Sequence, residues 1–135
     1  MTPRSPAAFK LLQDRPYDIV VSTRPPGAVA NVRRFWLYCA EEGRVSSFRH
    51  DIDDPAYAGD RKKMLRAAVR MVLQEVKSRT LANRQFLVWF QDEAARRVVE
   101  MTAAELAGNE PLQARSLEKM VLHSRTVGEG DVPKR

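Results

Sequence analysis

Residues 60–90 read DRKKMLRAAVRMVLQEVKSRTLANRQFLVWF, and this stretch predicts a helix followed by a buried strand. Asp60 is a suitable helix N-cap, and apolar side chains recur after it at helical spacing, which gives one face able to pack on a sheet. Those positions are Leu65, Ala68, Val69, Val72, Leu73 and Val76. After a polar link, residues 85–90 (QFLVWF) form a continuous apolar run of strand length, typical of a strand inside a sheet.

Three strands are expected before this helix. Residues 17–23 (YDIVVST) are rich in β-branched side chains and are followed by a Pro-Pro-Gly turn. Residues 32–40 (VRRFWLYCA) and 44–52 (RVSSFRHDI) flank Gly43, which suits a short hairpin loop because glycine tolerates positive φ. We therefore expect an antiparallel hairpin. Its first strand should place Phe35, Leu37 and Cys39 on one face, and Trp36 and Tyr38 on the other.

Two helices are expected after the buried strand. Asp92 is a suitable N-cap for the first, which Gly108 should end. Asn109 and Pro111 have the residue types for the N-cap and first position of the second. The prediction is a mixed α/β fold of order β-β-β-α-β-α-α, with an N-terminal segment at 1–16, a single domain at 17–124 and a flexible tail at 125–135.

This element order resembles the ribonuclease H-like fold over roughly residues 17–108. Two local features add to the resemblance: the Pro25-Pro26-Gly27 turn after the first strand, and Phe90-Gln91-Asp92-Glu93 at the end of the fourth. In nucleases of this family, carboxylates from the first strand, the first helix and the end of the fourth strand hold two Mg²⁺ ions.

Only Asp92 matches that carboxylate set. Ser22 or Thr23 stands where the resemblance implies the strand-one aspartate, and the helix offers Lys63, Met64 and Leu65 in place of a glutamate. One carboxylate cannot hold two metal ions. The resemblance therefore implies a degenerate, non-catalytic member with no metal and no cofactor.

Positive charge is concentrated in one segment. Residues 61–84 carry eight basic side chains and one acidic one, a net charge of +7, whereas residues 1–60 sum to 0 and residues 85–135 to −1. Such a local surplus attracts phosphate backbones or an acidic protein surface. The predicted binding residues are Lys62, Arg66, Arg70, Lys77 and Arg84, together with Arg33, Arg34 and Arg49.

Other candidates have simpler explanations. Trp36, Tyr38 and Trp89 could stack on nucleobases, but they lie in apolar runs and are predicted to be core residues. Asp92 is predicted to be a helix cap and no more. His50 and the aspartates at 51, 53 and 54 are of metal-ligand types, but neighbours on a strand point to opposite faces and converge poorly on one ion.

The leading functional hypothesis is a small nucleic-acid-binding protein, for DNA or RNA, that holds phosphates with the basic helix face. The alternative is an adaptor or inhibitor that docks an acidic protein partner, or that self-associates as a homodimer through the Trp-bearing sheet. A divergent hydrolase is a third reading. The single Cys39 and the lack of a long apolar run favour a cytoplasmic protein that does not enter a membrane.

Overall fold

The computed structural model describes residues 18–23, 32–41 and 44–126, and a five-stranded mixed sheet lies at its centre. The strands lie in the order β3-β2-β1-β4-β5. β2 pairs antiparallel with both β1 and β3, while β4 pairs parallel with both β1 and β5. Their bounds are β1 Ile19–Ser22, β2 Arg34–Glu41, β3 Arg44–Asp51, β4 Val88–Phe90 and β5 Ser124–Thr126.

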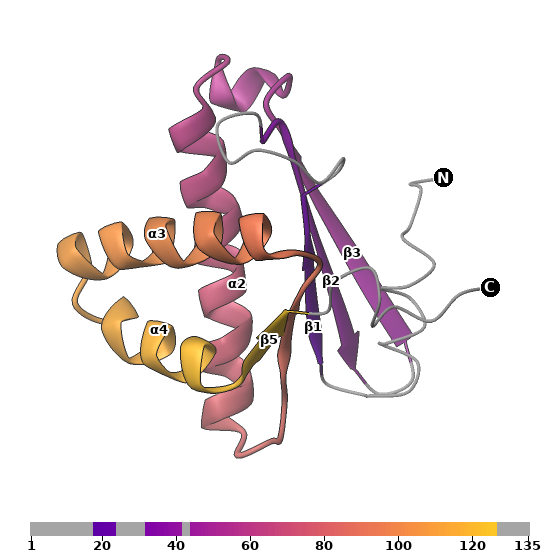
Figure 1. The fold of residues 1–135 in the computed structure, drawn as a ribbon, viewed down its shortest axis with the longest axis vertical. Coiled ribbons are helices and arrows are strands. Elements are labelled where there is room, and N and C mark those ends of the chain that lie inside the picture. Colours follow the sequence, from indigo (N-terminus) through magenta and orange to yellow (C-terminus); the bar gives the residue numbers. More distant parts are fainter. Residues whose placement is uncertain (1–17, 24–31, 42–43, 127–135) are drawn as a thin grey trace.

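Three α-helices of the described chain lie on one side of this sheet (Figure 1). α2 spans Arg61–Leu81 and carries the chain from β3 back to β4 after a short 3-10 helix, η2, at Pro55–Tyr57. α3 spans Glu93–Asn109 and α4 spans Gln113–Leu122. The mixed α/β architecture in a single domain is confirmed.

Two of the three predicted helix N-caps, Asp60 and Asp92, are confirmed, whereas Asn109 is the last residue of α3. Asp60 accepts a hydrogen bond from the Lys63 amide at 3.2 Å, and Asp92 accepts one from the Ala95 amide at 2.8 Å. Each carboxylate satisfies a backbone N–H that the first helical turn leaves without an intrahelical partner. The cap on α3 therefore gives Asp92 a structural role at the carboxyl end of β4.

The core separates into the two faces that strand periodicity predicts. The helix-facing side joins sheet residues to the inner faces of α2, α3 and α4, and its largest fully buried members include Phe35, Leu37, Leu73 and Phe90. The other side holds a second cluster, in which the rings of Trp36 and Tyr38 stack at 6.1 Å. The prediction that these aromatic residues are core residues is confirmed.

Three element boundaries differ from the sequence prediction. Only residues 88–90 of the expected 85–90 form the fourth strand; at Leu87 the amide donates to the carboxylate of Asp18, while the carbonyl accepts from the Ile19 amide. α3 continues through Gly108, and the Glu110 amide closes its last turn on Leu106 O at 2.7 Å. α4 consequently begins later than expected, with Leu112 at its N-cap and no side-chain cap.

The fifth strand was not predicted. Residues 124–126 pair parallel with β4, so the expected domain boundary at 124 falls inside this strand. The strand has only three residues, and its polar sequence, Ser-Arg-Thr, has no strand signal of its own. The predicted N-terminal segment, the turn at 24–27, the hairpin glycine and the tail beyond 126 lie outside the described residues.

Candidate binding surface on helices α2 and α4

The arginines predicted on the β2–β3 hairpin are mostly engaged within the protein. Arg33 pairs with Asp53 at 3.2 Å, and Arg34 pairs with Asp51 at 2.8 Å. The Arg49 guanidinium lies 5.7 Å from the ring centroid of Trp36, a cation–π distance. Arg33 and Arg34 thus already have counter-charges, and Arg49 lies over an aromatic ring, so the hairpin is a weaker candidate for binding anions than the sequence suggests.

The four predicted cations of α2 do not lie directly opposite its apolar face. Arg70 donates two hydrogen bonds to Glu110, at 3.1 and 3.3 Å, and this pair links α2 to the end of α3. Arg66 is half-buried, and Lys77 lies beside α4. The basic stripe therefore runs along the flank of α2 that faces α3 and α4.

Lys62, Arg66 and Lys77 form no ion pair with any residue in the described ranges. Lys62 and Lys77 are exposed, and 15 residues of helix separate them by roughly 22 Å. Lys63, one residue after Lys62, is also exposed. Arg84 is half-buried in the link between α2 and β4. Three of the eight predicted cations thus remain available along one helix flank.

One cation of the basic segment has a structural role. Arg79 is 4% exposed and donates to Glu75 Oε1 and Glu75 O, both at 3.2 Å, and to the backbone oxygen of Ala40 at 3.3 Å. The last of these bonds ties the end of α2 to β2. A count of charges along the sequence cannot separate such a buried arginine from a surface one.

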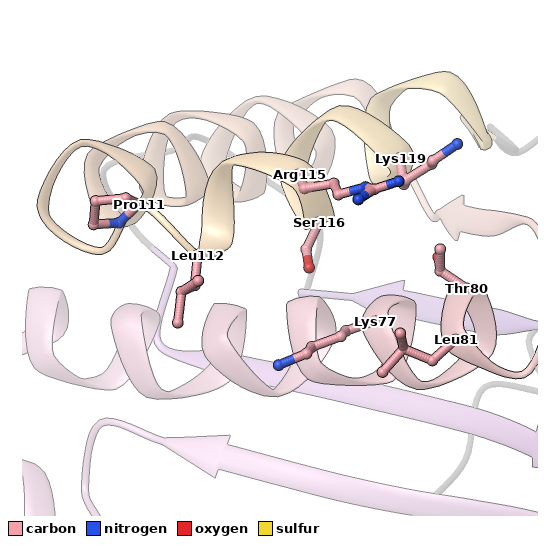
Figure 2. A pocket seen from close by; sticks show the side chains of 8 residues that line it. All are labelled: Lys77, Thr80, Leu81, Pro111, Leu112, Arg115, Ser116 and Lys119. Atoms are coloured by element: carbon pink, nitrogen blue, oxygen red, sulfur yellow. The ribbon is translucent and has the colours of Figure 1, made fainter.

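A groove of about 490 Å³ lies between the second half of α2 and α4 (Figure 2). α2 contributes Lys77, Thr80 and Leu81, and the α4 side contributes cationic and apolar side chains. Figure 2 shows Leu112 and Ser116 pointing from α4 toward α2. The α4 side of the groove comprises Pro111, Leu112, Arg115, Ser116 and Lys119.

The groove combines positive charge with exposed apolar surface. Lys77, Arg115 and Lys119 supply three cations, and none of the eight lining residues is acidic. Arg115 and Lys119 form no ion pair with a residue of the described ranges. Leu81 is 76% exposed and Leu112 is 86% exposed. Highly exposed leucines next to cations without ion pairs indicate a candidate interaction surface.

Sequence reasoning found Lys77 but missed Arg115 and Lys119. Leu112, Arg115, Lys119 and Leu122 are separated by three, four and three residues, so they follow one side of a helix. That spacing was the available signal. The net charge of residues 85–135 is −1, so a sum of charges along the chain does not reveal the basic stripe on this ten-residue helix.

The carboxyl ends of β1 and β4 meet where the resemblance places a metal site. Ser22 donates a hydrogen bond to Gln91 Oε1 across these strands, and both Ser22 and Thr23 are buried. Asp92 Oδ1 is occupied by the cap of α3. The described part of the chain holds no group of three or more His, Cys, Asp or Glu side chains arranged for a metal ion.

The histidine on β3 has an altered proton affinity. His50 Nδ1 lies 2.7 Å from the Tyr57 hydroxyl, and its Nε2 is buried without a hydrogen-bond partner in the described residues. Burial lowers the pKa of His50 below its usual value, and the nearby charge of Asp54 offsets part of that effect. Burial also raises the pKa of Tyr57. This pair lies on β3 and η2, away from the groove.

No protein-family model matches the chain, and no curated protein or solved structure shows significant similarity to it. Among the described helices, none has both the length and the apolar character needed to cross a membrane. Any function must therefore be argued from the residues of this chain.

Proposed function

We propose that the protein is a non-catalytic nucleic-acid-binding protein that holds phosphates with the cations of α2. The supporting observation is that Lys62, Arg66 and Lys77 follow one flank of the helix and form no ion pair with a residue of the described ranges. A cation without a protein counter-charge can bind a phosphate and release its condensed counterions, which favours binding.

The arrangement of elements also supports a ribonuclease H-like assignment, which we include in the proposal. Three antiparallel strands precede α2, and α2 leads to β4, which is parallel to β1. The resemblance implies a nucleic acid as ligand and places catalytic carboxylates at the ends of β1 and β4. Ser22 stands at the first of these places, so the chain retains Asp92 without the partners needed for two-metal chemistry.

Phosphate contacts of this kind should carry little sequence information. Lysine and arginine on one helix flank bind the backbone, whereas sequence is read by contacts to base edges. We therefore expect similar affinity for duplexes of unrelated sequence. We also expect the logarithm of affinity to fall with the logarithm of salt concentration by about 0.9 for each phosphate neutralised on B-form DNA.

The test is a salt titration of the full chain with a labelled duplex, using the variant K62E/R66E. Loss of these two contacts should reduce the magnitude of the log–log slope by about two units. The matched control is R44E/R97E, which changes the net charge equally at exposed arginines on β3 and α3. Equal weakening by both variants would show a response to net charge alone, and an absence of binding at low salt would overturn the proposal.

A further inference from the structure

We propose that the groove between α2 and α4 is a docking site for an acidic, leucine-containing segment of a partner protein. The groove shares Lys77 with the proposed nucleic-acid surface but does not include Lys62 or Arg66, and the inference does not depend on nucleic-acid binding. Its basis is the juxtaposition of three cations with two highly exposed leucines in one concave site.

Charge complementarity selects an acidic partner. Lys77 lines the groove from α2, while Arg115 and Lys119 line it from α4 (Figure 2). The carboxylates near the groove along the chain do not pair with its cations: Glu110 is held by Arg70 through two hydrogen bonds, Glu75 pairs with Arg79, and Glu118 forms no ion pair with a residue of the described ranges. Carboxylates of a partner would therefore meet three unpaired cations, which favours both association rate and orientation.

The apolar side chains distinguish a peptide from a phosphate backbone. Leu81 and Leu112 are 76% and 86% exposed, and they flank the cations from opposite helices. A phosphate gains nothing from contact with a leucine, and none of the eight lining residues is aromatic, so the groove offers no stacking surface for a base. Leucine-like side chains of a partner would bury both leucines while its carboxylates pair with the cations.

The surface on α4 has the periodicity of a helix-recognition site. Leu112, Arg115, Lys119 and Leu122 place an apolar residue at each end of a cationic pair, and Leu122 is also exposed. An amphipathic helix bound in the groove would present its own acidic and apolar anchors at i, i+3, i+4 and i+7 toward these residues, with Leu122 beyond the residues that line the groove. The proposed occupant is thus a short helix with glutamate or aspartate next to leucine.

The probe is a labelled synthetic peptide of about 16 residues, long enough for partial helix formation, with glutamate and leucine at helical spacing. One control peptide replaces each glutamate by lysine, and a second replaces each leucine by serine. Fluorescence anisotropy with the full chain should show binding of the first peptide at least about tenfold tighter than either control, since both charge and apolar burial contribute.

Protein variants then locate the site. R115E/K119E and L81Q/L112S should each weaken binding of the acidic peptide about tenfold, whereas K62E/R66E should leave it within about threefold. Leu112 is the N-cap of α4 and has no side-chain cap, so serine there suits the fold. Unchanged thermal midpoints would show that each variant is folded.

Several results would overturn the inference. If wild type and both groove variants bind the acidic peptide equally, its site lies elsewhere. If the peptide does not bind at a protein concentration of about 1 mM, the inference is wrong. The site would instead bind nucleic acid if a 16-nucleotide single strand displaced the peptide and bound L81Q/L112S as tightly as wild type. A dimer in sedimentation experiments that R115E/K119E converts to a monomer would identify the occupant as a second copy of this chain.

Discussion

The carboxylate of Asp18 accepts a hydrogen bond from the indole Nε1 of Trp89 at 2.8 Å, and this buried contact joins the starts of β1 and β4. The second carboxylate oxygen accepts the Leu87 amide at 3.1 Å. Asp18 is 2% exposed; its bond to the Trp89 indole is buried, and its bond to the Leu87 amide is partly buried. One side chain thus aligns the parallel strand pair on which the rest of the sheet is built.

Replacing Asp18 by alanine should lower the free energy of unfolding by about 3 kcal/mol, because the buried Trp89 indole and the partly buried Leu87 amide lose this acceptor. Asparagine should not rescue the loss, since its amide provides one acceptor and directs an NH₂ group at the other donor. Urea unfolding measures both effects. Trp89→Phe removes one donor, so D18N and W89F should be less than additive in a double-mutant cycle. Additive losses would show that the contact contributes little.

A second prediction separates the two kinds of cation in the basic segment. Arg79→Ala should destabilise the protein by about 2–3 kcal/mol, because it leaves Glu75 and the backbone oxygen of Ala40 without a buried donor. Arg66→Ala, at a half-buried position on the flank of the same helix that faces α3 and α4, removes no ion pair within the described residues and should cost less, about 0.5 kcal/mol. Thermal and urea unfolding measure both. Equal losses would contradict the assignment of Arg79 to the fold and Arg66 to binding.

The parts of the fold that local chemistry specifies were predictable from the sequence. The carboxylate of Asp60 and the spacing of apolar side chains from Ala68 to Val76 are enough to place α2, because capping and helical periodicity act within a few residues. The alternation of Phe35 and Trp36 likewise separated the two faces of β2. These signals need no knowledge of distant contacts.

The remaining features arise from tertiary contacts. β5 consists of three polar residues that become a strand only because β4 presents its open edge. The groove needs α2 and α4 to lie side by side, and Lys77 and Arg115 are 38 positions apart in the chain. The pairing of Arg70 with Glu110 is equally long-range. The net charge of residues 61–84 is enough to predict a basic helix, but it does not show which cations have counter-charges in the fold.

Stability should depend on pH through His50. Burial lowers the pKa of His50 in the folded protein, so the unfolded chain binds the proton more readily below about pH 6.5. The free energy of unfolding should therefore fall as pH drops from 7.5 to 5. His50→Gln can keep a hydrogen bond to Tyr57 and should flatten this dependence. Titration of His50 by NMR checks the cause directly, and a midpoint above 6.5 would contradict it.

Asp51 should also make stability depend on pH, but at lower pH than His50, so the two effects can be distinguished. The pKa of Asp51 is lowered, first by the hydrogen bond from the Asp53 amide and further by Arg34. A carboxyl group with a depressed pKa contributes stability that is present above its unfolded value and is lost only as pH falls below about 3.8. Asp51→Asn should therefore leave the slope between pH 7.5 and 5 unchanged.

The protein should not cleave nucleic acid. Asp92 Oδ1 caps α3 through the Ala95 amide, and the neighbouring strand presents Ser22 bonded to Gln91 where a second carboxylate would be required. Two-metal hydrolysis needs several carboxylates to hold both ions in line with the scissile phosphate. Purified protein incubated with labelled DNA or RNA in Mg²⁺ or Mn²⁺ should therefore show no turnover beyond that of Asp92→Asn. Cleavage by wild type that disappears in Asp92→Asn, with the thermal midpoint retained, would instead identify a hydrolase. That result would leave the cations of α2 as substrate-binding residues of an enzyme.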